Sequence, residues 1–340
     1  MATSNNKNRL AKPFYTNSPV IFTLPLGGKI LQGWVVLTGT VIIAGGTTNG
    51  TVLGEGGPIN LIKRIKVTAT PSAASRYPGG KIVDATPRSL LRYAIAQRNG
   101  AKFVGEQAGS TLGNGAPGTY SIYLAIPIYF TDSNLRNEMA TALNTDGPGA
   151  TPGGTYASVQ VEVDTGDLTT CFTGNDRTGT SNFTGLTVQW VDSRLGLAGD
   201  TLVRYQEDHI MQIGATNERA LDEAMPNDGA FESWTFLAEQ SAALTLSDNL
   251  LYRVTVDSPT LSLDLFAADI FQQMLDNGLI DASQSQIGLF HIDFTSGMLA
   301  NTVQAGPIQA YYQVANVSGA YLDDIRVFTR RVFAPIPAKS

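Results

Sequence analysis

This chain of 340 residues contains few of the side chains that carry most enzyme chemistry. Its one cysteine, Cys171, excludes an intrachain disulfide and any metal site built from several cysteines. Its only histidines are His209 and His291, and charged residues make up 15% of the sequence, against roughly 25% in an average globular protein. These shortages favour a structural or binding protein over an enzyme. The low charge also indicates that much of the surface is covered by something other than water.

Two further absences concern membranes and nucleic acids. No apolar run approaches the roughly 18 residues of a membrane-spanning helix, because even the stretch 33–46 is interrupted by Thr and Gly. The net charge of −6 argues against direct nucleic-acid binding as the main role, since such proteins are usually basic. The first residues lack the apolar segment of a signal peptide, so we expect a soluble protein made in the cytoplasm.

What the chain does contain is a succession of short segments typical of strands. Runs rich in Val, Ile and Thr at 20–26, 30–45 and 61–70 are bounded by Gly or Pro. The 35 glycines and 16 prolines fit many turns between short strands. The sequence therefore predicts an all-β protein.

Two short helices interrupt this pattern. The first is predicted over 86–99, with Thr86 as N-cap and Pro87 in the first turn. The second, in "AADIFQQMLDNG", places apolar residues four apart along one face. Both stretches end in an Asn-Gly pair, which is a common helix stop. Two helices with the same stop signal suggest that one unit occurs twice.

An internal repeat supports that interpretation. Three pairs of strand-like segments match in the same order, with a helix in the same place in each half. The offset between the matched segments falls along the chain, as expected if the connections in the second copy are shorter. The matched pairs are 61–67 with 250–256, 123–131 with 287–295, and 159–163 with 308–312. We therefore expect two β-sandwiches side by side, each with one short flanking helix.

The two predicted helical regions differ in charge. The first carries basic residues and the second carries acidic ones. Two interpretations are open: the faces are simply solvated, or copies of the chain meet with one sign near the other, which would set which edges associate. The candidate inter-subunit residues are Arg88, Arg92, Arg98, Asp264, Asp269 and Asp276.

Candidates for chemistry are weak. His291 alternates with apolar residues in a strand and predicts a position on a surface or interface, while His209 stands among acids without a second metal-ligating His or Cys. The Gly-Gly-Lys stretches at 27–30 and 79–83 lack the frame of a phosphate loop and predict turns. Ca²⁺ binding at 164–167 or 173–176 is conceivable but lacks the EF-hand spacing, so we expect no cofactor, no metal and no enzyme activity.

The repeated β pattern resembles the double jelly-roll major capsid proteins of tailless icosahedral viruses, in the lineage of tectivirus-like and corticovirus-like phages with an internal membrane. The resemblance rests on "FTLPLGGKILQGWVVLTGTVIIAGG", on "INLIKRIKVTATP" with its helix, and on "IYF" and "IDF" in the two halves. It covers about residues 20–335. The parts it implies are an N-terminal arm (1–19), a first jelly roll (20–172), a linker (173–185), a second jelly roll (186–335) and a C-terminal tail (336–340).

The resemblance also implies a function. Such subunits form homotrimers with a pseudo-hexagonal footprint, and the trimers tile the virion shell together with minor capsid or penton proteins and over an internal lipid membrane. Basic residues of the arm, Lys7, Arg9 and Lys12, would face that membrane or a neighbouring trimer. The loops expected at 100–119, 131–157 and 205–243 would be exposed or inter-subunit elaborations.

Two alternatives remain at this point. A receptor- or carbohydrate-binding β-sandwich, such as a spike protein, would need an exposed aromatic platform, but Trp34, Trp190 and Trp234 are scattered over strand-like runs. A β-sandwich glycoside hydrolase would need two carboxylates about 5–10 Å apart in a groove. The sequence pairs none of its acids in that way.

Overall fold

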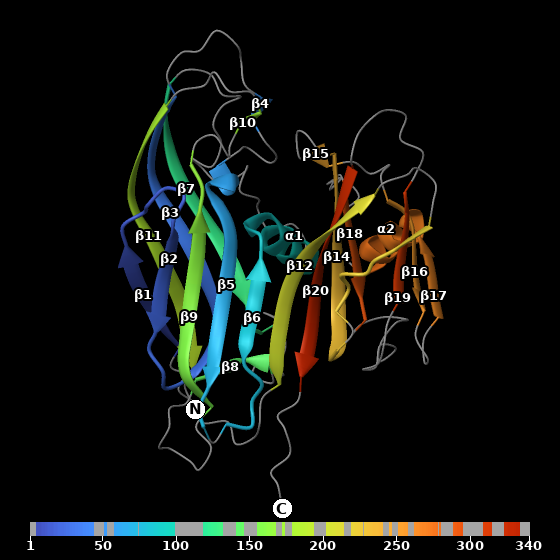
Figure 1. Ribbon diagram of the computed structural model, residues 1–340, viewed down its shortest axis with the longest axis horizontal. Coiled ribbons are helices and arrows are strands. Elements are labelled where there is room, and N and C mark those ends of the chain that lie inside the picture. Colours follow the sequence, from blue (N-terminus) through green and yellow to red (C-terminus); the bar gives the residue numbers. More distant parts are fainter. Residues whose placement is uncertain are drawn as a thin grey trace, which may run out of the picture.

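A computed structural model shows two β-sandwiches standing side by side, with their strands roughly parallel (Figure 1). Helix α1 (Pro87–Arg98) lies between the sandwiches, and helix α2 (Ala267–Asp276) lies within the second. The described residues are 5–43, 51–52, 58–73, 75–98, 118–131, 141–145, 155–167, 172–173, 179–193, 202–213, 219–226, 228–240, 245–246, 251–257, 262–277, 279, 288–294, 309–314 and 323–333.

The first sandwich consists of two sheets with the strand orders β1-β11-β3-β7 and β6-β5-β9-β2. Short β8 (Leu143–Asn144) adds to β3, and β4 (Thr51–Val52) pairs with β10 (Phe172–Thr173). The main strands are β1 (Asn5–Lys12), β2 (Pro19–Leu24), β3 (Lys29–Ile43), β5 (Ile62–Pro71), β6 (Gly80–Ala85), β7 (Gly118–Tyr129), β9 (Tyr156–Thr165) and β11 (Gly179–Ser193). A 3-10 turn, η1 (Pro58–Leu61), precedes β5.

The second sandwich repeats this arrangement with the orders β12-β20-β14-β18 and β17-β16-β19-β13. Short β15 (Thr245–Leu246) adds to β14. The main strands are β12 (Val203–Ile213), β13 (Arg219–Leu221), β14 (Ala230–Gln240), β16 (Leu251–Asp257), β17 (Ser262–Phe266), β18 (Leu289–Asp293), β19 (Gln309–Val314) and β20 (Asp323–Phe333).

The predicted duplication is confirmed by strand order and by register. β5 pairs with β9 through Ile65 and Val163, and β16 pairs with β19 through Val254 and Tyr312. These are the residues that the matched sequence segments place in equivalent positions. Every main strand of the first sandwich thus has a counterpart in the second, from β1 and β12 to β11 and β20.

The two sandwiches are joined by strand pairing. β6 and β12 pair in parallel, with Val83 opposite Gln206 and Asp84 opposite Glu207. This pairing merges one sheet of each sandwich into a continuous nine-stranded sheet. Each sandwich also has its own apolar core, because alternate residues of its strands point inward. The largest side chain in the second core is Trp234, which is fully buried against Phe231, Phe236 and Phe294.

Three predicted boundaries are wrong. Most of the predicted linker 173–185 belongs to β10 and β11, and β11 pairs along its length with β3. β11 therefore closes the first sandwich, and the second begins at β12 and not at residue 186. The N-terminal arm is an edge strand, β1, paired with β11. Ladder hydrogen bonds come from the backbone, so polar Thr, Ser and Asn can fill a strand that hydropathy assigns to a linker.

The loop predicted at 205–243 is also wrong, because it contains β12 and β14. The polarity of β12 misled the prediction: three of its outward-facing polar side chains, Arg204, Gln206 and Asp208, are buried. The two helices, by contrast, are confirmed. Thr86 lies directly before α1, and Ile270 and Met274 are on the buried face of α2. The stop signal at 99–100 lies outside the described residues.

Candidate functional site: the junction between the two sandwiches

The junction is built mainly from one face of β12. Three alternate residues of this strand point at the first sandwich and are at most 5% exposed: Arg204, Gln206 and Asp208. Arg204 donates to the carbonyl oxygen of Phe130 at 2.7 Å, and the Gln206 amide donates to that of Tyr129 at 2.9 Å. These bonds pair polar groups that would be costly to bury alone. They fix β12 against the end of β7.

Asp208 holds the start of α1. Its Oδ2 accepts hydrogen bonds from the Thr86 amide at 2.9 Å, the Thr86 hydroxyl at 2.7 Å and the Ser89 hydroxyl at 2.6 Å. A helix N-terminus leaves amide donors unpaired and carries partial positive charge, so a carboxylate is well placed there. Because Asp208 lies 122 residues further along the chain than Thr86, this cap connects the two sandwiches.

Arg64 on β5 completes the connection. Its guanidinium lies 3.1 Å from Asp208 Oδ1, donates to the Asp208 carbonyl at 3.2 Å, and pairs with Asp84 of its own sandwich. Burial by itself would lower the pKa of Arg64. The charges of Asp208 and Asp84 and their hydrogen bonds outweigh this and raise it. Arg64 is therefore a permanent cation that ties both carboxylates together.

Further along α1, aromatic and basic groups pack between the sandwiches. The Arg330 guanidinium of β20 lies 4.3 Å from the centre of the Tyr93 ring of α1, and burial lowers its pKa to about 9. The Tyr93 ring also packs against Phe328 and His291 of the second sandwich. Since Tyr93 is 1% exposed, α1 belongs to both cores.

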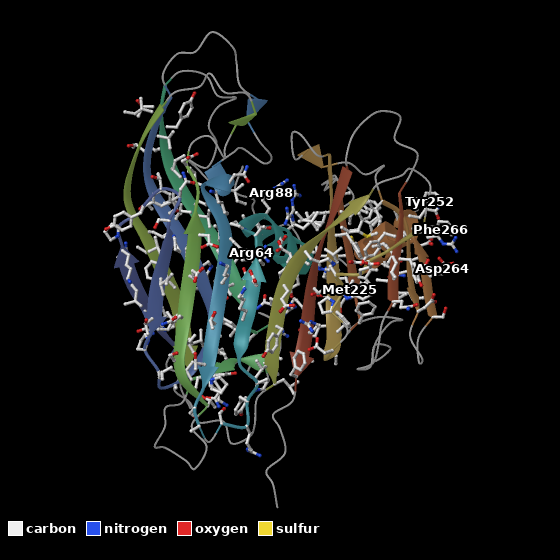
Figure 2. The ribbon with its side chains drawn as sticks, viewed as in Figure 1. Arg64, Arg88, Met225, Tyr252, Asp264 and Phe266 are labelled. Atoms are coloured by element: carbon white, nitrogen blue, oxygen red, sulfur yellow. The ribbon has the colours of Figure 1, made fainter. Side chains whose placement is uncertain are left out.

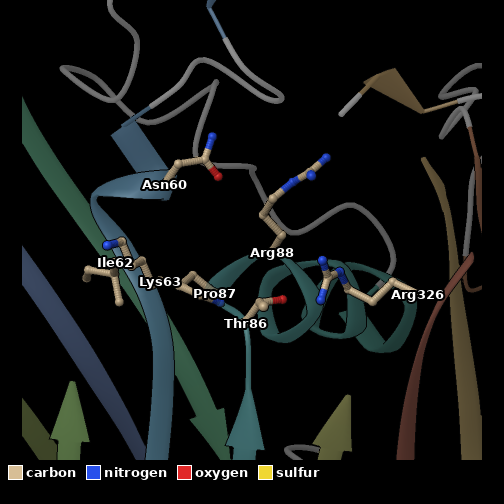
Figure 3. Close-up of a pocket in the computed structure, with 7 residues that line it drawn as sticks. All are labelled: Asn60, Ile62, Lys63, Thr86, Pro87, Arg88 and Arg326. Atoms are coloured by element: carbon tan, nitrogen blue, oxygen red, sulfur yellow. The ribbon is translucent and has the colours of Figure 1, made fainter. Parts of the chain in front are cut away.

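A pocket of about 210 Å³ opens beside the start of α1 (Figure 3). Arg88 rises from the helix and Arg326 extends from β20, while the Lys63 amine points away and donates to Asn17 at 2.9 Å. The lining is basic, with two arginines and one lysine and without a carboxylate, histidine or cysteine. The lining residues are Asn60, Ile62, Lys63, Thr86, Pro87, Arg88 and Arg326.

The equivalent face of the second sandwich lies at the far end of the molecule (Figure 2). Arg253 pairs there with Asp264, as Arg64 pairs with Asp84. The Tyr252 and Phe266 rings meet edge to face at 5.5 Å and are 47% and 41% exposed. This face therefore presents aromatic and charged groups to the outside.

The predicted inter-subunit residues divide into three groups. Arg88 and Arg92 are 5% and 7% exposed and lie inside the chain, so the prediction that they face another subunit is wrong for both. The side chain of Arg98 lies outside the described part of the structure. Asp264 belongs to β17, while Asp269 and Asp276 lie on α2, and all three are exposed.

The basic residues predicted in the N-terminal arm lie on β1. Arg9 is exposed at the edge of the sheet. Lys12 turns toward its own sandwich, where its amine donates to the Ile21 carbonyl at 2.5 Å. Lys7 pairs through its backbone with Val191, and its side chain is not among those described.

Both histidines lie beside a polar side chain of the same chain. His291 is buried and not on a surface, with Nδ1 2.8 Å from the Thr235 hydroxyl. His209 lies 2.7 Å from Asp222. The chain bends at Gly27 and Gly28, where Gly27 has φ +117°, and both residues exchange backbone hydrogen bonds with Thr145.

The Ca²⁺ candidates gain no support from the described residues. Asp164 pairs with Lys66 and Asp167 accepts from Asn17, while residues 174–176 fall outside the described ranges. Within those ranges no three His, Cys, Asp or Glu side chains gather as a metal site would require. Neither described helix has the length and apolar character needed to cross a bilayer.

Sequence reasoning missed the residues that make the junction: Asp208, Arg204 and the Arg64–Asp84 pair. One signal did exist, because Arg64 and Arg253 occupy the same position in the matched segments 61–67 and 250–256. A basic residue kept in both copies of a strand marks a shared contact. Its partners could not be found, because β12 has no apolar alternation to reveal it as a strand.

Comparison with known proteins gives the fold its class. No family model matches the sequence, and no curated protein matches it significantly. Solved structures do match. The major capsid protein of the Sulfolobus turreted icosahedral virus has a TM-score of 0.66 at 10% identity, covering 98% of both chains. The major capsid protein P2 of bacteriophage PM2 has a TM-score of 0.54 at 12% identity, covering 97% of this chain and 98% of its own.

A third match extends the comparison to another virus. The Faustovirus major capsid protein has a TM-score of 0.57 at 10% identity, covering 99% of this chain and 91% of its own. At sequence identities this low, the matches show that the proteins share a fold. The fold is a double jelly roll, which confirms the predicted all-β class with one short helix in each half.

Proposed function

We propose that this chain is the major capsid subunit of an icosahedral virus and forms trimers with a pseudo-hexagonal outline that tile the shell. The observation that carries this proposal is the match to the capsid protein of the Sulfolobus turreted icosahedral virus over 98% of both chains. A likeness that spans both sandwiches includes their junction, and the junction sets the spacing of neighbouring walls in an assembly.

Physical features of the chain support the same function. A ring of subunits needs repeated edges of one kind facing repeated edges of another, and two equivalent sandwiches in one chain provide them. A charge content of 15% suits extensive subunit contacts, whose cores are depleted in charged residues.

The proposal includes a setting. The chain would be made in the cytoplasm of the host cell, a bacterium if the virus is a phage, and would reside in the virion shell. It would contact its own copies, minor capsid or penton proteins, and an internal lipid membrane. Because Arg9 lies on an edge strand beside an ordered sheet, we favour a neighbouring subunit over the membrane as its contact.

A carbohydrate- or receptor-binding sandwich is less well supported. Its predicted platform would need exposed Trp side chains, but Trp234 is 0% exposed and Trp190 is 3% exposed. Trp34 is half-buried against Leu31 and Ala142. These positions suit core packing and leave no broad indole surface among the three.

The test is the size and outline of the purified protein. Light scattering should give three times the 36.2 kDa chain mass, and negative-stain microscopy should show particles with a hexagonal outline. A compact monomer at all concentrations, without that outline, would rule out the capsid proposal. Binding on a glycan array by that monomer would support the alternative.

A further inference from the structure

Two edges of the molecule correspond to the two edges that meet at the junction. Within the chain, β6 of the first sandwich pairs with β12 of the second. The counterpart of β6 is β17, and the counterpart of β12 is β1. Among the described strands, β1 and β17 each end a sheet, and they lie at opposite ends of the long axis (Figure 1). Such edges expose unpaired backbone donors and acceptors.

The equivalence can be fixed residue by residue. Phe130 donates its amide to the Leu31 carbonyl in the first sandwich, and Phe294 donates to the Glu232 carbonyl in the second. These two hydrogen bonds are equivalent and fix a common starting point. Following the strand pairings from β3 through β11 to β1, and from β14 through β20 to β12, then makes Asn8 equivalent to Glu207. Arg9 consequently occupies the position of Asp208.

The opposing edge aligns in the same way. Ile65 faces Ala85 across β5 and β6, and Val254 faces Leu265 across β16 and β17. Asp84 is therefore equivalent to Asp264, in agreement with the repeated Arg–Asp pair. At the junction Asp84 stands opposite Glu207, so the equivalent pair is Asp264 opposite Asn8.

Among the described residues, the Arg–Asp pair of the second edge is more exposed than its counterpart at the first edge. The Arg64 and Asp84 side chains are 31% and 18% exposed, whereas Arg253 and Asp264 are 38% and 45% exposed. α1 contacts β5 and β7 of its own sandwich and also β14 and β20 of the second. The main contacts of α2 are with β16, β17 and β18 of its own sandwich. The additional cover at the first edge comes from β12, β14 and β20.

The charges of the two edges are complementary. At the junction an acid, Asp208, meets the start of the basic helix α1. At the far edge the signs reverse: Asp269 stands at the third residue of α2, where it accepts from the Phe266 amide at 3.1 Å. The residue equivalent to Asp208 is Arg9, an exposed cation. An arginine at this position is suited to pair with a carboxylate of the neighbouring copy, just as Asp208 accepts hydrogen bonds from Thr86 and Ser89 at the junction.

We infer that β17 of one copy pairs in parallel with β1 of the next copy, with Asn8 of that copy opposite Asp264 and its Arg9 beside Asp269. This contact repeats the β6–β12 junction between chains and is the step that closes the ring. The inference rests on the proposed self-assembly and names the surface that makes it. Exposed Phe266 occupies the position of Thr86, which is partly buried at the junction, so we expect Phe266 to lose exposure in this contact.

Disulfide trapping tests the register directly. Residues opposite each other on neighbouring strands lie about 4.8 Å apart, within the roughly 4.4–6.8 Å between Cα atoms that a disulfide spans. In a full-length Cys171→Ser background, the variant Asn8→Cys with Asp264→Cys should oxidise to a covalent trimer on a non-reducing gel. A matched pair inside the chain, Glu207→Cys with Asp84→Cys, should oxidise without any change in mass.

In the negative control, the cysteine at Asp264 is replaced by one on β7, at the opposite edge of the sheet that contains β1. Asn8→Cys with Thr119→Cys, an exposed position on β7, should give no covalent trimer. Suppose that light scattering shows a native trimer and the Glu207/Asp84 pair cross-links, but the Asn8/Asp264 variant does not. That result would overturn this inference and leave the capsid proposal standing. A chain that stays monomeric would overturn both.

A charge exchange gives a second readout that does not depend on oxidation. Arg9→Asp should place like charges together and raise the concentration of half-dissociation by about ten-fold, and Asp269→Arg should do the same. Combining the two should restore wild-type association. Lys12→Asp, the same charge change on the inward-facing side of β1, should have a much smaller effect. Failure of the double variant to recover, in trimers that the single variants do weaken, would contradict the pairing of Arg9 with Asp269.

Discussion

Asp208 should be among the most stabilising single side chains at the junction. Replacing it with Ala removes three hydrogen bonds to the start of α1 and the 3.1 Å contact with Arg64, and leaves their donors in a buried site. Breaking a buried charged network by removing one partner costs about 3–5 kcal/mol. With an unfolding entropy of about 2.1 cal/mol/K per residue for 340 residues, this lowers Tm by roughly 4–7 °C.

Two assays separate a local effect from a global one. Scanning fluorimetry measures the change in Tm, and hydrogen exchange measures protection of the Thr86 amide, which donates to Asp208 in the native fold. We expect the amide to exchange faster in Asp208→Ala even under conditions where the chain is folded. Asp208→Asn should cost less, because one amide oxygen can still accept from Thr86 or Ser89 while the charge toward Arg64 is lost.

The neighbouring residue on β12 is the matched control. Glu207 also pairs with an arginine, Arg331 at 2.6 Å, but its side chain is 30% exposed. Glu207→Ala should therefore cost less than about 1 kcal/mol, as exposed ion pairs do. If Asp208→Ala and Glu207→Ala have the same small effect, the buried network does not stabilise the junction and the reasoning is refuted.

Three other predictions test the core and the backbone. Burial lowers the pKa of His291 to about 4, while an unfolded histidine titrates near 6.5, so the unfolded chain binds the extra proton and stability falls as the pH drops from about 6.5 to 4. In urea titrations at pH 7 and pH 4, His291→Asn should lose less stability than wild type by up to about 3 kcal/mol, and equal losses would contradict the burial argument. Gly229 has φ +76° and its Cβ would lie 2.6 Å from an aromatic ring at the end of β20, so Gly229→Ala should cost about 1–3 kcal/mol, whereas Gly185→Ala, in open space, should be near neutral. Trp234→Ala should cost about 3–5 kcal/mol by emptying the second core, and a cost under 1 kcal/mol would show that this core tolerates the cavity.

Much of the fold follows from the sequence where apolar residues alternate. β5 and β9 and their counterparts β16 and β19 alternate buried and less buried side chains, so their segments could be matched between halves to the correct register. The sequence did not predict β11 and β12 correctly. The first part of β11 is nearly all Thr, Ser, Asn and Gly. β12 buries polar groups whose partners are distant in sequence, 77 positions away for Gln206 and 122 for Asp208.

The site was harder to predict for the same reason. A buried Asp and an exposed Asp look alike in a sequence, and the difference between Asp208 and Asp269 arises only when β6 and β12 meet. The charge contrast between the helices could be seen, and it pointed at the right elements. The interpretation changed, because Arg88 and Arg92 are interior residues, whereas Asp269 and Asp276 of α2 are exposed.

The reversal of sign between the two edges has a consequence for which walls can meet. If two first sandwiches came together through these edges, Arg9 would stand at the start of α1, beside the Arg64 that now binds Asp208. If two second sandwiches did so, Asp208 would face Asp269. Each wrong pairing juxtaposes like charges, and only the alternating order brings opposite charges together. A duplicated chain could assemble out of register by one sandwich. The exchanged charges make that arrangement unfavourable, so the charges of the two edges determine the order of sandwiches around a ring.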